Sequence, residues 1–507
     1  MDRLGEKAAI GRFEIEEDRW IHGELNVAGE KSSLYLRDPE FFMVRDDATE
    51  ALRGELNDLT KVTCIKCNEA GPGSASRNDT GYSFAETFPH YVVHGDEYLD
   101  PKAKSIFKVE FRISDEAHLF ADFGAFASLI DAKPFIAPIV AAYGKAIDHE
   151  IEVGDRPQIA FFSGKSTIFE ADTVIGKVSA RHYAGPSGGG ARGVRIDNQI
   201  WCAIAYDDGA QFDDVINHMV RVMRFLSLIV GRPQSLVDCD LVLAAKGGMP
   251  PERLKLYWSF APQREPAFGH KEREPLLHDM LMRPADEPDV FASVLAAWLA
   301  RDAAWLEPRG RLAGCLEWQN RFDVDRLVAA ANMFDLLPDD AVPKTAPVSD
   351  EMRAAVKATR ETFLKFEPSP ERQSVLQSLG RIGKPVLKRK VRHRAQIVLD
   401  SLGDDRLKDL FLVCDQAVDC RNRYVHGSET DLDHVSHFGH TIFFTATLEF
   451  VFAAADLIEC GWDAKVWWKL GTTQSHPFGA FKIGYAGHLA DLKKSLAEPS
   501  AGAVGGA

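Results

Sequence analysis

The spacing of the apolar residues changes near residue 213, and this change limits what the chain can fold into. Before it, residues alternate within short runs such as Gly11-Arg12-Phe13-Glu14-Ile15 and Leu34-Tyr35-Leu36. Turns rich in Gly, Asp and Asn separate these runs, a pattern typical of β-strands. After it, apolar residues recur every three or four positions, as in Val215, Met219, Val222 and Leu226, which is helical spacing. We therefore predict an α+β protein, with a β-rich N-terminal region followed by an α-helical bundle.

The chain must also divide into domains. Its 507 residues exceed the roughly 250–300 residues that a single hydrophobic core serves. We predict a β-rich region over residues 1–315, a helical bundle over 316–470, and a C-terminal extension over 471–507 with a disordered end. A division of the first region into 1–150 and 151–315 is an open alternative. The run Gly185-Pro186-Ser187-Gly188-Gly189-Gly190 is expected to be a flexible loop.

Helical spacing continues from residue 213 to the end of the bundle, and the remainder of the chain is expected to be mainly helical. Short polar connections between helices indicate an antiparallel bundle, and Gly461 is a suitable residue to end the last helix. The segments expected to be helical are 290–306, 321–337, 350–367, 391–402, 405–426 and 435–459.

Charge and composition exclude several classes of protein. The formal net charge of -15 argues against a protein that coats nucleic acid by bulk electrostatics, so any RNA contact must be local. Neither a signal peptide nor a long uninterrupted apolar stretch is evident, which predicts a cytoplasmic protein without membrane contact. Only Cys64 and Cys67 of the eight cysteines lie close together, and one such pair is a weak zinc signal. We predict no cofactor and no metal.

The helix expected over 405–426 carries an apolar stripe that an arginine interrupts. Arg421 stands where the three-and-four spacing predicts another core residue, after Leu410, Cys414, Ala417 and Val418. Burying a guanidinium group is costly unless it is paired. We therefore expect Arg421 at the bundle surface, in a subunit interface or in a wet cleft.

Asn422 and His426 lie four positions apart and so share a helix face, with Arg421 one step round. Gly427 is a natural helix stop that leaves His426 in the last turn. Metal-free RNA cleavage needs a base, an acid and a cation for the phosphorane, and two paired helices would supply two histidines and two arginines. The alternative is that Arg421 and His426 cap the helix end, binding its carbonyls or an acid such as Asp419 or Glu429.

Two further groups of residues carry open alternatives. The basic run from Arg381 to Arg394 either follows an RNA backbone or forms a solvated helix face. The cations predicted to bind RNA are Lys388, Arg389, Lys390, Arg392, Arg394 and, beside the motif, Arg423. His434, His437 and His440 are three apart, but no acid or cysteine completes an evident metal site, so a role near RNA is as open as metal binding.

The run from Asp419 to Gly427 resembles the signature of the HEPN superfamily, an arginine and a histidine separated by a few residues, in its Arg-Asn-x-x-x-His form followed by glycine. The order of helices around it resembles the Apea-like HEPN domain of bacterial anti-phage proteins. The region beginning Gly11-Arg12-Phe13 and continuing through Gly23-Glu24-Leu25 is similar to the β-rich domain that accompanies that HEPN domain. The resemblance thus covers most of the chain.

The resemblance implies a role for each motif residue: acid/base catalysis for His426, phosphate stabilisation for Arg421 and positioning for Asn422. It also implies a homodimer with a composite cleft, or a larger homo-oligomer. The implied activity is that of an endoribonuclease of abortive infection, held latent, with transfer RNA as a plausible target and a phage-derived trigger at the N-terminal region. The alternative is a non-catalytic RNA-binding or adaptor protein whose N-terminal region binds a ligand or phage component.

Overall fold

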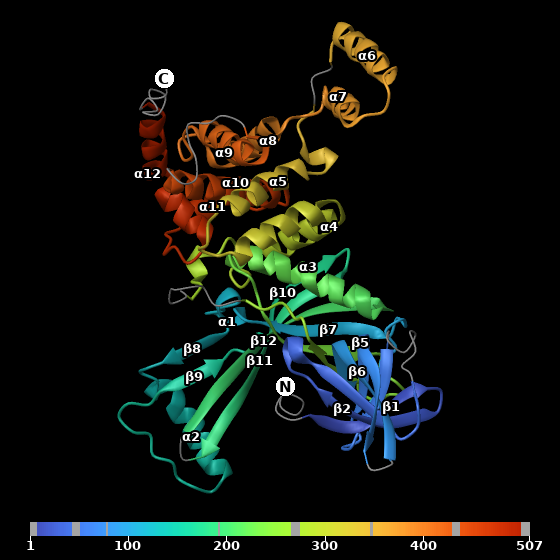
Figure 1. The fold of residues 1–507 in the computed structure, drawn as a ribbon. Coiled ribbons are helices and arrows are strands. Elements are labelled where there is room, and N and C mark those ends of the chain that lie inside the picture. The colour runs from blue at the N-terminus through green and yellow to red at the C-terminus, as the bar shows by residue number, and fades with distance from the viewer. Residues whose placement is uncertain are drawn as a thin grey trace. The chain divides into compact units, whose positions relative to one another are not determined.

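The chain folds into two compact units, residues 1–300 and 301–507 (Figure 1). The computed structural model describes residues 8–42, 51–77, 80–190, 193–264, 274–344, 348–427 and 437–497. The first unit is β-rich and the second is helical. This is the α+β architecture that the change in apolar spacing predicts.

Six strands of the β-rich unit close into a barrel. They run in the order β6-β3-β2-β1-β4-β5, and β5 also pairs with β6. Closure leaves no free sheet edge between these strands. The side chain of Phe13 fills the interior, and a Cβ at Gly23 or Gly54 would meet its ring at 2.3 or 2.4 Å, so both glycines make room for it. The strands are β1 (Ala9–Glu16), β2 (Arg19–Asn26), β3 (Ser33–Asp38), β4 (Ala51–Leu56), β5 (Lys61–Arg77) and β6 (Thr80–Gly95).

The sheet continues beyond the barrel from β6 in the order β14-β13-β7-β12-β11-β10. It includes strands from both sides of residue 150. Strands β13 and β14 follow the first long helix, where a mainly helical chain was predicted, and that prediction is wrong there. These strands are β7 (Ile106–Ile113), β10 (Thr167–Thr173), β11 (Gly176–Gly190), β12 (Gly193–Ala210), β13 (Leu236–Leu243) and β14 (Arg253–Trp258).

The glycine-rich run predicted to be a loop belongs to strand β11. Gly185 pairs with Asp197 and Gly188 with Val194 of β12. On its other side β11 pairs with β10 only as far as Arg181, so Pro186 lies where one side of the strand has no neighbour in the described sheet. A proline is tolerated on such an edge because no ladder hydrogen bond is lost. Pairing with β12 therefore overrides the turn preference of the local sequence.

Helix α3 (Phe212–Val230) packs against the sheet at β7 and β12. Val215, Met219, Val222 and Leu226, the residues whose spacing predicts this helix, are all buried. The helix ends at Gly231, whose φ of 83° lies in the left-handed region that glycine adopts without strain. The predicted helix is confirmed.

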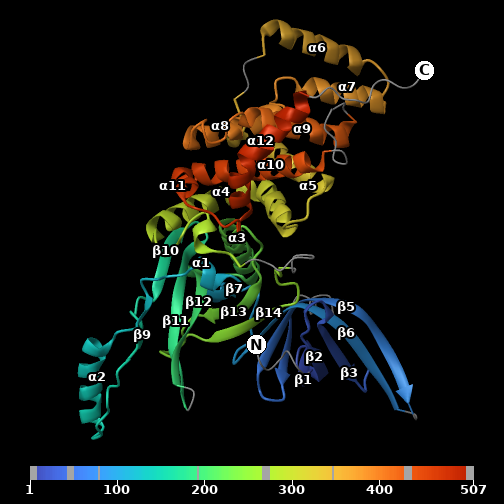
Figure 2. The ribbon, with the colours of Figure 1, turned by 90° about the vertical axis from the view of Figure 1, so that its left-hand side faces the viewer.

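Helix α10 (Phe438–Glu459) is central to the helical unit and contacts α5, α8, α9 and α12 (Figure 2). The predicted helices are present, but the sequence interpretation missed α7, α11 and α12. Neither α6 nor α7, described over their whole length, has a buried residue. The predicted disordered end lies in residues 498–507, outside the described ranges. The other helices are α4 (Pro288–Glu317), α5 (Val324–Asp335), α6 (Asp350–Leu364), α7 (Pro370–Arg381), α8 (Leu387–Leu402), α9 (Leu410–His426), α11 (Ala464–Lys469) and α12 (Pro477–Ala497).

Helix α10 is long and apolar enough to span a membrane by length and composition, but 83% of its most apolar window is buried within the structure. It also carries three acids that face arginines of other helices, an arrangement typical of a core helix whose charges are paired. Glu449 accepts a bidentate pair of hydrogen bonds from Arg326 at 2.8 and 2.9 Å. The other two pairs are Asp456 with Arg309 and Glu459 with Arg394.

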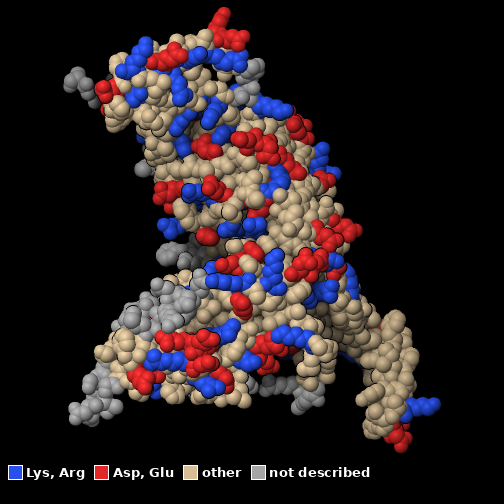
Figure 3. Space-filling model, turned by 90° about the vertical axis from the view of Figure 1, so that its right-hand side faces the viewer, with Lys and Arg blue, Asp and Glu red and all other residues tan. Residues whose placement is uncertain are grey.

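Charged side chains of both signs are interspersed over the face seen in Figure 3. No single sign dominates this face, as expected for a protein that does not bind nucleic acid through bulk electrostatics.

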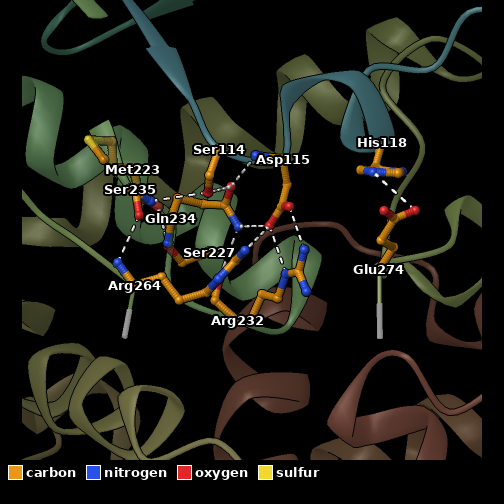
Figure 4. Close-up of polar contacts among 10 residues, drawn as sticks. All are labelled: Ser114, Asp115, His118, Met223, Ser227, Arg232, Gln234, Ser235, Arg264 and Glu274. Atoms are coloured by element: carbon orange, nitrogen blue, oxygen red, sulfur yellow. Dashed lines mark hydrogen bonds and ion pairs between the residues drawn. The ribbon is translucent and has the colours of Figure 1, made fainter. Parts of the chain in front are cut away.

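Asp115 shows how the β-rich unit pairs a buried charge (Figure 4). Its Oδ2 accepts hydrogen bonds from Arg232 Nε, Gln234 Nε2 and Arg264 Nη1, each at 2.8 Å. Burial alone would raise the pKa of this carboxyl group, but hydrogen bonds from Arg232 and Gln234 and the nearby positive charges lower it. The cluster joins the end of β7 to the segment between α3 and β13. Its role is structural.

Candidate active site

Helix α9 places the Arg-Asn-x-x-x-His motif at its C-terminal end. Its apolar side is buried through Leu410, Cys414, Ala417 and Val418, which fixes the rotation of the helix in the bundle. The helix ends at Gly427, whose φ is 69° and whose N–H donates to the carbonyl of Arg423. The last turn therefore carries the motif in the position that the spacing predicts.

The structure brings the three motif side chains together. Arg421 Nη1 lies 3.1 Å from Asn422 Oδ1 and 3.3 Å from His426 Nε2. A guanidinium group can only donate, so Nε2 of His426 is the acceptor in this contact. Arg421 is 9% exposed, whereas His426 is exposed. The motif thus combines a held cation with an imidazole that solvent or a ligand can reach.

Two residues of α5 also hold Arg421, and sequence reasoning missed both. Asn332 Oδ1 accepts from Arg421 Nη2 at 2.7 Å, and Asp335 Oδ2 lies 3.6 Å from the same nitrogen. Both residues fall in the helix predicted over 321–337 and are three apart, so they share its polar side. Nothing in the local sequence links them to Arg421, which is 89 residues further along the chain than Asn332.

Arg421 does not cap the C-terminal end of α9. Its guanidinium group contacts side chains of α5 and of the motif, not the last carbonyls of α9. Asp419, one of the acids considered as its partner, lies 2.7 Å from Lys388 Nζ. Glu429, the other, lies outside the described residues. Burial of the guanidinium is therefore supported by partners within this chain.

The predicted RNA-binding cations of α8 differ in how accessible they are. Arg389 is exposed and has no ion-pair partner among the residues that the structure describes. Lys388 pairs with Asp419, Lys390 lies 3.7 Å from Asp335 Oδ1, and Arg392 pairs with Asp415, all near or on the motif helix. Arg423, half-buried on α9, lies beside the motif.

Arg394 is the exception among these cations, because its side chain is fully buried. Its Nη1 lies 2.9 Å from Glu459 Oε2, and its guanidinium lies 5.1 Å from the centre of the Trp305 ring. Burial opposes ionisation of Glu459, but Arg394 and Arg301 overcome this effect and lower its pKa. Arg394 therefore stabilises the bundle core, and its side chain is not accessible to RNA, contrary to the prediction.

The residues considered for metal binding lie elsewhere. His437 and His440 stack with their ring centres 5.9 Å apart, and His440 Nε2 lies 2.9 Å from Ser495 Oγ of α12; His434 is outside the described residues. Cys64 and Cys67 are buried in the barrel core, where their mutual hydrogen bond and burial raise the pKa of Cys64. Within the described ranges, no three His, Cys, Asp or Glu residues are grouped to hold a metal.

The site combines two chemical abilities. An exposed imidazole can accept or donate a proton, and a guanidinium beside it can stabilise negative charge that develops on an oxyanion. Asn332, Asp335 and Asn422 hold the guanidinium from two helices, which limits the reorganisation needed when an anionic group arrives. This combination suits acid/base chemistry on a phosphate ester.

Comparison with family models finds two matches that together cover most of the chain. Residues 10–298 match ApeA N-terminal domain 1, and residues 328–466 match the Apea-like HEPN domain. The second match includes both Asn332 and the motif on α9. No curated protein and no solved structure matches the chain.

Proposed function

Because this chain belongs to the family defined by ApeA N-terminal domain 1 and carries an Apea-like HEPN domain, we propose that it is a metal-independent endoribonuclease of anti-phage defence. HEPN domains are typically ribonucleases and imply an RNA substrate. The observation that carries the proposal is the contact of Arg421 with both Asn422 and His426. In a metal-free mechanism Arg421 is the cation and His426 is the group that transfers the proton.

In the proposed reaction, one imidazole accepts the proton of a ribose 2′-hydroxyl, and the 2′-oxygen attacks the adjacent phosphorus. The bond from phosphorus to the 5′-oxygen then breaks, and an acid protonates that leaving oxygen. Arg421 stabilises the negative charge of the phosphorane. The products are a 2′,3′-cyclic phosphate and a 5′-hydroxyl end.

The mechanism needs both a base and an acid, and each chain supplies one histidine in the motif. We therefore propose a homodimer in which two α9 ends face one another, so that one His426 is the base and the other the acid. Tyr424 and Val425, beside His426 in the same helix turn, are 36% and 43% exposed. Exposed apolar residues next to the motif support such a contact, and a larger homo-oligomer would preserve it.

The proposal extends to the biological setting. We propose a cytoplasmic effector of abortive infection that stays latent until the β-rich unit meets a phage-derived trigger, with transfer RNA as a plausible substrate. Arg389, Lys388, Lys390, Arg392 and Arg423 are the cations proposed to contact the RNA backbone. Because four of them lie on α8 beside the motif helix, an RNA bound to them would pass close to His426.

The ends of the cleaved RNA test the reaction directly. We expect purified protein to release fragments with 2′,3′-cyclic phosphate ends, at an unchanged rate in excess EDTA, because no metal takes part in 2′-hydroxyl attack. Sequencing of 3′ ends with and without phosphatase treatment measures this. Fragments with 3′-hydroxyl ends, or loss of cleavage in EDTA, would refute the mechanism. RNA binding without cleavage would instead support the non-catalytic alternative.

Asn332 is expected to act as a positioning residue for Arg421. Asn332→Ala removes the 2.7 Å contact and should lower kcat about 10-fold or more, since misplaced charge stabilisation weakens the transition state rather than substrate binding. KM should change little. Asn332→Asp keeps the acceptor oxygen and should restore much of kcat. Equal losses in both variants, with a lowered melting temperature, would indicate a purely structural role.

A further inference from the structure

An arm of the β-rich unit carries a helix that the rest of the described chain leaves uncovered. Strands β8 (Phe126–Leu129) and β9 (Ile159–Phe162) pair in a separate two-stranded sheet, and α2 (Lys133–Ala146) lies between them in sequence. Of the 14 residues of α2, all of them described, only Gly144 is buried. The helix is nevertheless strongly apolar, since its only charged residues are Lys133 and Lys145.

The exposed apolar side chains of α2 form a regular row. Phe135, Ile139 and Tyr143 are spaced by four residues and are 60%, 63% and 60% exposed. Ala142 and Ala146 continue the a and d spacing of a coiled-coil seam from Phe135 and Ile139. In Figure 3 the projection at the lower right is almost entirely free of charged side chains. A seam of this kind is stable in water only when another surface covers it.

The exposed apolar surface of the arm is large enough for a stable interface. Nine large apolar side chains between residues 123 and 161 are 37% to 81% exposed. At roughly 150–200 Å² for each side chain, they expose on the order of 800 Å². One partner contributes about 800 Å² to an interface of standard size. The nine residues are Phe123, Leu129, Ile130, Phe135, Ile139, Tyr143, Ile147, Ile151 and Phe161.

The row of α2 is symmetric about Ile139, because an aromatic residue stands four positions on either side of it. When two such helices cross antiparallel at Ile139, Phe135 of each lies against Tyr143 of the other, which satisfies a two-fold interface. In the same crossing Lys133 of one helix lies level with Lys145 of the other, because each lysine is six residues from Ile139. The apolar row is therefore self-complementary, whereas the lysines at the two ends of the helix are not.

A lipid surface fits this arm less well. Helices that lie on membranes carry a polar face rich in Lys and Arg, which attracts anionic lipids. Residues 131–156 contain five acids against three Lys or Arg, and the acids Asp148, Glu150 and Glu152 are exposed. An anionic membrane would repel this end of the helix. The chemistry of the arm therefore favours a protein partner.

We propose that α2 is a self-association helix, which pairs antiparallel with α2 of a second copy of this chain about a two-fold axis at Ile139. The interface is separate from the motif on α9 and does not depend on the activity proposed for it. A chain that also pairs through α9 has two different two-fold interfaces, and such chains assemble into tetramers or longer oligomers.

Cysteine cross-linking tests the pairing at its symmetry axis. In Ile139→Cys, the new thiols of two copies face each other at the crossing point, so mild oxidation should convert most of the protein into a disulfide-linked dimer. The eight native cysteines are buried and should not contribute. The matched control is Val174→Cys, which is 70% exposed in the turn between β10 and β11. The inference fails if Ile139→Cys does not cross-link, or cross-links no more than the control.

Light scattering of Ile139→Asp gives a second test. The charge should prevent pairing and lower the molar mass at least two-fold, with an unchanged melting temperature because Ile139 is mostly exposed. Val174→Asp should keep the wild-type mass. Adding His426→Ala should change neither result, which separates this inference from the proposed ribonuclease activity. An unchanged molar mass of Ile139→Asp would overturn the inference. This holds whether or not the wild-type protein binds anionic phospholipid vesicles.

Discussion

Replacing His426 with alanine is expected to lower RNA cleavage by at least ~10²–10⁴-fold, the usual contribution of a general acid or base. In the proposed dimer the change removes the base and the acid together. His426 is exposed and its described contact is the one with Arg421 Nη1, so the fold should be preserved. The measurement is the single-turnover cleavage rate, with far-ultraviolet circular dichroism to verify folding. A loss of rate without a loss of structure would identify His426 as a catalytic residue.

The matched control is His488→Ala, an exposed histidine of the same unit that packs against Phe443 of α10. It should cleave at the wild-type rate. Arg421→Lys should also lose about 10²–10³-fold, because an ammonium cannot contact Asn332 and the motif at once in the way a planar guanidinium does. If His426→Ala cleaves RNA at the wild-type rate, the motif is not the active site.

Replacing Glu449 with alanine is expected to lower the free energy of unfolding of the helical unit by ~3–5 kcal/mol. The change leaves the guanidinium of Arg326 buried without its carboxylate, although two backbone carbonyls, of Gln319 and Arg321, still accept from it. Removing one partner of a buried pair is costly because the remaining charge cannot regain its hydration. Denaturant unfolding followed by circular dichroism measures the loss.

Lys493→Ala provides the comparison for a solvated pair in the same unit. Lys493 and Asp409 lie 2.5 Å apart with side chains 46% and 39% exposed, and such pairs contribute at most ~1 kcal/mol. The double variant Arg326→Met, Glu449→Leu should recover much of the stability lost in Glu449→Ala, since apolar replacement of a buried pair is often tolerated. A loss below ~1 kcal/mol in Glu449→Ala would show that water reaches Arg326.

Local patterns account for most of the secondary structure that could be predicted. The three-and-four spacing identifies α3 and α9 because their buried sides repeat at the helical period, whereas α10 is identified by its long apolar run. The spacing of apolar residues does not identify β13, where Cys239 to Leu243 are all buried and show no alternation, and it does not identify β14. It also fails for Gly185 to Gly190, where pairing with β12 determines the strand. In each failure the deciding contact comes from another part of the chain.

The sequence by itself determined that Asn422 and His426 share a helix face, with Arg421 one step round, because residues four apart on a helix lie on the same side. It also determined the α+β class, since periods of two and three to four specify strands and helices locally. Only the tertiary structure decided which charges are buried and by whom they are paired. Asn332 and Asp335 hold Arg421. Glu459 forms an ion pair with Arg394, a residue predicted to bind RNA.

The physical reason is that the free energy of a buried charge depends on partners and solvent supplied by other elements, which a linear pattern does not contain. The same reason applies to α2, whose apolar row is indistinguishable in sequence from that of a core helix. Only the tertiary structure shows that the row on α2 is exposed.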